Sequence, residues 1–121
     1  MIIDHIGLAM SDYEASKKFF SLALAPLGIE LAKEAHGWAA FGKGGKPEFW
    51  FGEGDKQVPM HIAFAAESRD QVRAFYQAAL EAGGRDNGAP GIRENYHPNY
   101  YGAYVMGPDG HNIEAVCHAP G

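Results

Sequence analysis

The fold is decided by Asp4-His5-Ile6-Gly7-Leu8-Ala9, because the chain repeats this stretch 56 residues later as Met60-His61-Ile62-Ala63-Phe64-Ala65. Bulky and small residues alternate in both stretches, which is typical of a strand with one buried face. The match continues without a gap: Phe19 meets Phe75, Phe20 meets Tyr76, Ala23 meets Ala79, Leu24 meets Leu80 and Gly28 meets Gly84. We therefore predict one domain made of two repeated modules, about 1–56 and 57–121.

The first module is predicted to contain a strand, a helix and three further strands. Ser11 and Asp12 are suitable N-cap residues, and Ser11 has capping-box spacing to Glu14, so the helix is expected to begin near Tyr13. Its predicted buried face and the predicted strands follow: Ala15, Phe19, Phe20, Ala23 and Leu24 on the helix, and strands over 2–9, 30–35, 37–42 and 47–52.

The second module repeats this order. A strand over 60–66 precedes a helix that starts after the Ser68–Gln71 capping box and ends at Gly83-Gly84. Strands over 100–106 and 112–118 are predicted to form a hairpin around 107–110, whereas the second strand, near 85–87, is poorly defined and a loop is expected over 88–99. The predicted fold class is therefore α+β, with two repeated βαβββ modules.

Composition excludes several classes of protein. The chain has 121 residues, of which 46% are hydrophobic and 21% charged, so it can form one core. Its formal charge of -5 and the lack of a basic stripe argue against nucleic acid. No apolar stretch is long enough for a membrane span and the first residues lack a signal-peptide pattern, so the cytoplasm is the expected location. With one cysteine, Cys117, any metal must use His and carboxylate ligands.

Strand alternation predicts a cleft with metal-ligating side chains. His5 and His61 each share a strand face with small residues, and the last strand of each module carries one acid among apolar residues, Glu48 and Glu114. If the repeat brings these four groups together, two imidazoles and two carboxylates suit a divalent ion such as Zn, Ni, Mn, Fe or Co.

Simpler interpretations stay open for each residue. A single strand histidine is usually a hydrogen-bonded core residue, and Glu48 can lie on the wet side of an edge strand. The other histidines favour loop or surface positions, with His118 on the Glu114 face. Cys117 is expected to be a buried structural thiol. The run 96–101 fits either strand packing or the rim of a pocket.

The motifs resemble the vicinal oxygen chelate superfamily, which contains glyoxalases, bleomycin resistance proteins and extradiol dioxygenases. Asp4 to Leu8 is similar to its opening strand, His61 to Phe64 to its middle strand, and Pro108 to Glu114 to its closing turn and metal strand. The resemblance covers essentially the whole chain and is closest to glyoxalase I-like members. It implies paired βαβββ modules that form an open, cupped mixed sheet around a divalent metal, a small-molecule substrate, and a site often built at the interface of a homodimer.

By this resemblance His5, Glu48, His61 and Glu114 match the four metal ligands of glyoxalase I. The implied activity is a lyase or isomerase that stabilises an enediolate, with Glu114 or Glu48 as the proton-transferring base. A substrate pocket is expected from the residues around the predicted loop: Arg93, His97, Asn99, Tyr100 and Tyr101. Two alternatives remain: an Fe(II) dioxygenase that uses His5, His61 and Glu114 alone, and a metal-free binding or resistance protein.

Overall fold

The computed structural model describes residues 3–121, which form two four-stranded sheets and two α-helices. The first module contains β1 (Ile6–Met10), α1 (Tyr13–Ala23), a 3-10 turn (Ala25–Leu27), β2 (Glu30–Ala35), β3 (Trp38–Gly42) and β4 (Phe49–Glu53). The second contains β5 (His61–Ala65), α2 (Arg69–Glu81), β6 (Arg85–Ile92), β7 (Tyr101–Met106), a 3-10 turn (Pro108–Gly110) and β8 (Asn112–Cys117).

The two sheets have the same topology. Their strand orders are β1-β4-β3-β2 and β5-β8-β7-β6. In each sheet the first strand pairs in parallel with the last strand of its module, and the remaining pairs are antiparallel. This confirms the predicted α+β fold with two βαβββ repeats.

The helices begin at side-chain caps. Asp12 accepts a hydrogen bond from the backbone N–H of Ala15 at 3.0 Å, and Ser68 accepts one from Gln71 at 3.1 Å. Asp12 is therefore the N-cap of α1, and the predicted Ser11–Glu14 capping box is not formed: Ser11 instead donates to Asp109 from both its N–H and its hydroxyl. That contact ties the first module to the turn before β8.

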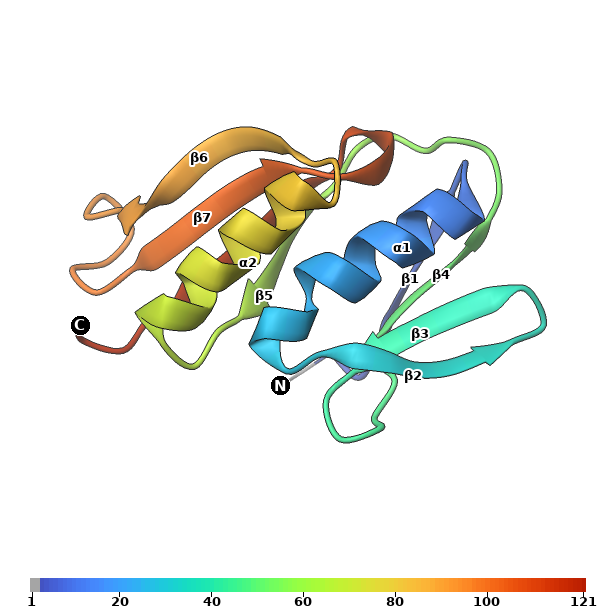
Figure 1. Ribbon diagram of the computed structural model, residues 1–121, viewed down its shortest axis with the longest axis horizontal. Coiled ribbons are helices and arrows are strands. Elements are labelled where there is room, and N and C mark those ends of the chain that lie inside the picture. Colours follow the sequence, from blue (N-terminus) through green and yellow to red (C-terminus); the bar gives the residue numbers. More distant parts are fainter. Residues whose placement is uncertain (1–2) are drawn as a thin grey trace.

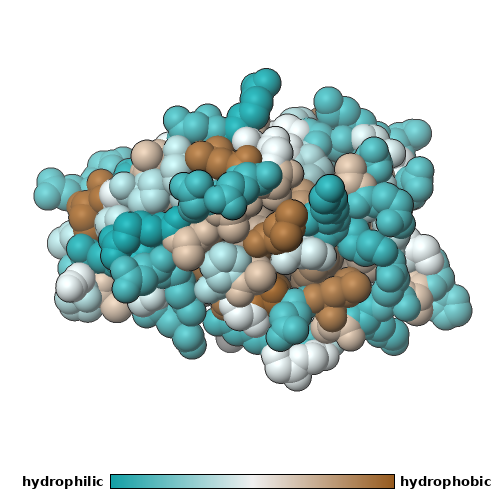
Figure 2. Space-filling model, in the orientation of Figure 1, coloured by the Kyte–Doolittle hydropathy of each residue, from teal (hydrophilic) through white to brown (hydrophobic). Residues whose placement is uncertain are grey.

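Both helices lie on the same side of the molecule, where they pack against each other and cover one face of the sheets (Figure 1). Their outer surfaces are mostly hydrophilic, with only scattered apolar patches (Figure 2). The helices are thus amphipathic layers between the core and solvent.

One apolar core runs through both modules. Phe20 of α1 is fully buried and packs against Phe49, with ring centroids 4.9 Å apart, and Phe49 meets Phe64 of β5 edge to face at 5.3 Å. Each such ring stabilises the fold by about 1.5–3 kcal/mol through burial. The α1 face differs from the prediction at one position, since Ser16 is buried and Ala15 is exposed.

Three further predictions need correction. The expected loop over 88–99 begins later, because β6 extends to Ile92; it is an edge strand and so tolerates Pro90. The strands predicted over 2–9 and 47–52 start at Ile6 and Phe49, which leaves His5 and Glu48 just before β1 and β4, while Ile2 lies outside the described residues. His111 was expected at the surface but is fully buried.

Neither helix in the described part of the chain is long and apolar enough to cross a membrane.

Candidate metal centre on the open sheet faces

Each sheet has a second face that no helix covers, and the predicted histidines lie on these open faces. Alternation along β1 turns Leu8 into the core while His5 and Gly7 stay exposed. In β5 the exposed positions are His61, Ala63 and Ala65. The small residues leave room beside each imidazole, as the sequence pattern predicts.

In the second module, His61 and Glu114 form a direct pair. The Nε2 atom of His61 lies 2.7 Å from Oε1 of Glu114. The Glu114 side chain is fully buried, whereas 53% of the His61 side chain is exposed. A buried carboxylate is costly without hydrogen-bond partners, and Glu114 has a second one, because the Tyr100 hydroxyl donates to Oε2. These two contacts hold the carboxylate in place, and the imidazole that is bound to it is half exposed to solvent.

Two neighbouring residues shape this pair. A Cβ atom on Gly102 would lie 3.2 Å from Oε2 of Glu114 and 3.2 Å from the Tyr100 ring, so glycine at this position makes room for both side chains. Tyr104 lies opposite Glu114 in the β7–β8 register, and its ring centroid is 6.0 Å from that of His61. Burial, followed by the contact with Glu114, raises the pKa of Tyr100, so its hydroxyl stays a proton donor at neutral pH.

The sheet register gives the first module a different residue at the position of Glu114. Ala63 pairs with Glu114 in the second sheet, and the repeat equivalent of Ala63 is Gly7, which pairs with Trp50. Trp50 therefore takes the place that Glu114 has in the other module. Glu48 lies two residues before Trp50 on the same face, and its equivalent in the second module is Asn112. The two predicted carboxylates, Glu48 and Glu114, are therefore not related by the repeat.

His5 and Glu48 nevertheless lie near His61. The three residues line one cleft of about 420 Å³ between β1 and β5, the facing edge strands of the two sheets. His5 is hydrogen-bonded to Asp4 through Nδ1 at 2.8 Å, which leaves Nε2 free. Glu48 is half-buried, and its Oε1 lies 3.5 Å from Nζ of the exposed Lys46.

This geometry fits a metal ion in part. Ligand atoms at about 2.0–2.2 Å from one ion lie roughly 3 Å apart, and the His61–Glu114 separation of 2.7 Å is close to that spacing. Among residues 3–121 of this single chain, however, no group of three His, Cys, Asp or Glu side chains is close enough to hold one ion. The four-ligand centre thus stays a prediction, with one preformed pair.

The predicted pocket residues fall into three groups. Tyr100 contacts Glu114, and Arg93 stacks over Tyr104 with its guanidinium 5.3 Å from the ring centroid, so both belong to the open face of the second sheet. Tyr101 points away, toward Arg69 and Arg73 of α2. His97 and Asn99 hydrogen-bond each other in the loop before β7, next to His118.

Sequence reasoning missed Trp50 and Tyr104. Both lie in the same rows as the predicted ligands, but their positions depend on strand register, and the chain carries no local signal that fixes register.

A duplicated βαβββ chain with imidazoles and a buried glutamate on its open sheet faces has the architecture of the vicinal oxygen chelate proteins. The family model for the Glyoxalase/Bleomycin resistance protein/Dioxygenase superfamily matches residues 2–115, and the chain belongs to this family. A comparison with curated protein sequences finds no match.

Solved structures agree with this assignment. A glyoxalase/bleomycin resistance protein from Albidiferax ferrireducens T118 is 27% identical, with a TM-score of 0.84 over 97% of this chain and 99% of its own. A putative glyoxalase from Bacillus halodurans has 23% identity and a TM-score of 0.71, and covers 96% of this chain and 95% of its own. A glyoxalase I mutant from Zea mays has 20% identity and a TM-score of 0.69 over 94% of this chain and 46% of its own. The last two show similarity of fold alone.

Proposed function

We propose that the protein is a divalent-metal-dependent lyase or isomerase of the glyoxalase type that acts on a small oxygenated substrate. The observation that supports this most is the cleft that His5, Glu48 and His61 share, with His61 bound to the buried Glu114. Family membership supports the metal, and the match of His5, Glu48, His61 and Glu114 to the ligands of glyoxalase I supports the type of reaction.

The four residues would have unequal roles. His5, His61 and Glu114 would hold the ion, since two imidazoles and one carboxylate form a stable face for a divalent metal. The ion, when bound, would polarise the substrate oxygens and stabilise the negative charge of an enediolate. Zn, Ni, Mn, Fe and Co all fit this donor set.

Glu48 is the better candidate for the base that moves the proton. It is half-buried in the cleft, and its one ion pair among the described residues is the 3.5 Å contact with an exposed lysine, so it can change protonation without disrupting the core. Glu114 is already hydrogen-bonded to His61 and Tyr100, and moving it would leave the Tyr100 hydroxyl without its acceptor.

The complete centre is proposed to form in a homodimer. Both sheets have an uncovered face, and 61% of the His5 side chain and 53% of that of His61 are exposed in the single chain. If the open face of one sheet packs over that of a second copy, the ligands of the two modules can approach each other, as in many relatives.

A hemithioacetal isomerisation assay, run with and without chelator, tests the reaction. We expect turnover that chelator abolishes and added divalent metal restores. Glu48→Gln should lower kcat by about 100-fold or more while the bound metal stays, because the base is removed but the ligands are kept. Glu67→Gln, an exposed carboxylate outside the cleft, is the matched control. Bound metal without turnover would refute the glyoxalase assignment.

An Fe(II) dioxygenase of the extradiol type is the second candidate. It is favoured by Trp50, which replaces the acid that the repeat would otherwise supply and leaves two histidines and one glutamate as ligands. Oxygen uptake with catechols after ferrous loading distinguishes it from the isomerase. A protein that binds neither ferrous iron nor another divalent metal would instead be a binding or resistance protein of the same family.

A further inference from the structure

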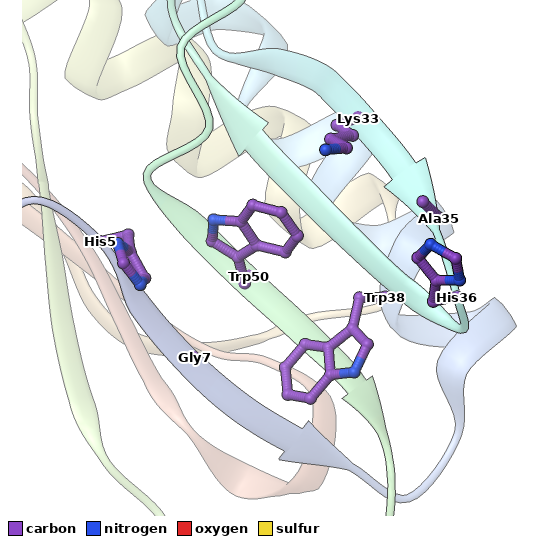
Figure 3. Close-up of a pocket in the computed structure, with 7 residues that line it drawn as sticks. All are labelled: His5, Gly7, Lys33, Ala35, His36, Trp38 and Trp50. Atoms are coloured by element: carbon purple, nitrogen blue, oxygen red, sulfur yellow. The ribbon is translucent and has the colours of Figure 1, made fainter.

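The open face of the first sheet carries a second hollow, which the proposed chemistry does not use. It measures about 470 Å³, within the range of roughly 300–1,000 Å³ typical of small-molecule sites. Trp38 of β3 and Trp50 of β4 project from neighbouring strands over this hollow (Figure 3). The other residues that line it are His5, Gly7, Lys33, Ala35 and His36.

The two indoles are accessible and held in position. Trp38 is 41% exposed although it is one of the largest apolar side chains. Its ring lies over Gly52, where a Cβ atom would come within 2.9 Å of it, so the glycine lets the indole lie flat against the backbone. Neither indole N–H donates a hydrogen bond to any residue from 3 to 121. Both rings thus offer a stacking surface and an unused donor.

The charge of the hollow is positive. Lys33 lines it and makes no ion pair with any residue from 3 to 121, and none of the described residues that line the hollow is acidic. This contrasts with the net charge of -5 for the whole chain. An aromatic cage for a cation would need the opposite arrangement, because a lysine in the wall repels a cationic ligand.

The register places these features in one row. Across the first sheet Gly7, Trp50, Ala40 and Lys33 are successive partners, whereas the same row of the second sheet reads Ala63, Glu114, Tyr104 and Gly88. In this row Trp50 takes the position of the Glu114 carboxylate. Ala40 takes that of the Tyr104 phenol, and Lys33 places an ammonium group where the second sheet has Gly88. A planar ring can therefore stack on the indoles while its acidic group reaches Lys33.

We propose that this hollow binds a planar aromatic carboxylate, with Trp38 and Trp50 contacting the ring and Lys33 the acid. His5 lines both this hollow and the cleft shared with His61, so a ligand seated here adjoins the candidate metal centre. That the aromatic carboxylate is a substrate rests on the proposed function. That it binds in the hollow does not, because the hollow needs no metal to bind it.

Intrinsic fluorescence tests the proposal directly, because Trp38 and Trp50 are the only two tryptophans in the chain. Chelator-treated protein is titrated with 2-naphthoate, with the neutral 2-naphthamide, and with cyclohexanecarboxylate, which has the acid without the aromatic ring. We expect saturable quenching by 2-naphthoate, with calorimetry giving the same Kd. The amide should bind about threefold more weakly, as befits an exposed ion pair, and the non-aromatic acid at least tenfold more weakly, at about 1.4 kcal/mol per factor of ten.

Variants separate the two contacts. Trp38→Leu should weaken 2-naphthoate binding by about tenfold, the effect of losing one stacking contact, with Trp50 left to report quenching. Lys33→Gln should weaken naphthoate by about threefold and leave the amide unchanged, whereas Lys18→Gln, an exposed lysine on α1, should change neither. Circular dichroism establishes that each variant is folded.

Equal affinity for the acid and the amide, undiminished binding by Trp38→Leu, or no saturable binding at all would each overturn the proposal. The titration is done without metal, so its outcome does not depend on the proposed function. If the protein fails to retain a metal ion, the proposed function is contradicted, but saturable binding of 2-naphthoate would still support the aromatic carboxylate site.

Discussion

At the scale of single residues, Glu114 is the centre of the site. It is a fully buried carboxylate whose two oxygens are occupied by His61 and Tyr100. His5, His61 and Glu114 could be selected from the sequence, because two histidines recur at the same place in a repeat and an acid interrupts an apolar strand. Tyr100 as the partner of Glu114 could not, since its hydroxyl reaches the carboxylate from the residue just before β7.

Tyr100→Phe should lower the free energy of unfolding by about 1–3 kcal/mol, because it leaves one oxygen of a buried carboxylate without a donor. Urea denaturation of the metal-free protein measures this. Tyr96→Phe is the control: its side chain is 64% exposed and should give a change near zero. A Tyr100→Phe protein as stable as the wild type would mean that the hydroxyl does not satisfy Glu114.

Buried His111 makes the stability depend on pH. Its Nδ1 accepts a hydrogen bond from the N–H of Met60 at 2.8 Å, and burial lowers its pKa, an effect that Asp109 partly opposes. The unfolded chain, with an ordinary histidine pKa of 6.5, therefore binds the proton more readily than the folded chain. The stabilisation is complete above this pH and is lost as the pH falls below it.

We expect the free energy of unfolding to decrease between about pH 7 and pH 5, and His111→Asn to flatten this decrease, because an amide oxygen can still accept the Met60 hydrogen bond but does not titrate there. His36→Asn is the control, since His36 is an exposed turn residue with a φ of 55° that asparagine tolerates. An unchanged slope in His111→Asn would contradict this explanation.

At the scale of elements, the sequence predicted the helices and most strands to within a few residues, because the repeat and the capping residues act locally. The second part of β6, from Gly88 to Ile92, was mistaken for a loop because Gly88, Pro90 and Gly91 suggest a turn, and only pairing with β7 makes this segment a strand. That Glu48 and Glu114 are not equivalent in the repeat could not be predicted for a similar reason: alternation fixes which face a side chain occupies, but the register decides that Trp50, and not Glu48, corresponds to Glu114.

The two helix caps should contribute equally to stability, as the repeat implies. Asp12→Ala and Ser68→Ala each remove one hydrogen bond to the first turn of a helix and should each lower the free energy of unfolding by about 1 kcal/mol. Thermal and urea unfolding measure both. Ser11→Ala removes the hydroxyl hydrogen bond to Asp109, keeps the one from the backbone N–H and leaves the cap intact. Its destabilising effect should therefore add to that of Asp12→Ala in a double variant, and strong coupling between the two would contradict this assignment.

At the scale of the whole molecule, two similar sheets present chemically different open faces. The second carries the buried acid and its imidazole, and the first carries two indoles and a lysine. The helices cover only the opposite faces, so most of the candidate chemistry lies on surface that a second copy can cover.

Light scattering after gel filtration should therefore give about twice the chain mass of 13.1 kDa. Ala65→Glu places a charge on the open face of the second sheet, away from the two indoles, and should shift the protein toward the monomer, while Lys18→Glu on α1 should not. A wild-type protein that is monomeric at all concentrations would refute the shared centre.

Elemental analysis of untagged, freshly purified protein shows whether His5, His61 and Glu114 hold a divalent metal. We expect about one ion per chain in the wild type and in Glu67→Gln, and a loss of most of that metal in both His5→Ala and Glu114→Gln. A wild type that carries no more metal than Glu114→Gln would contradict this expectation.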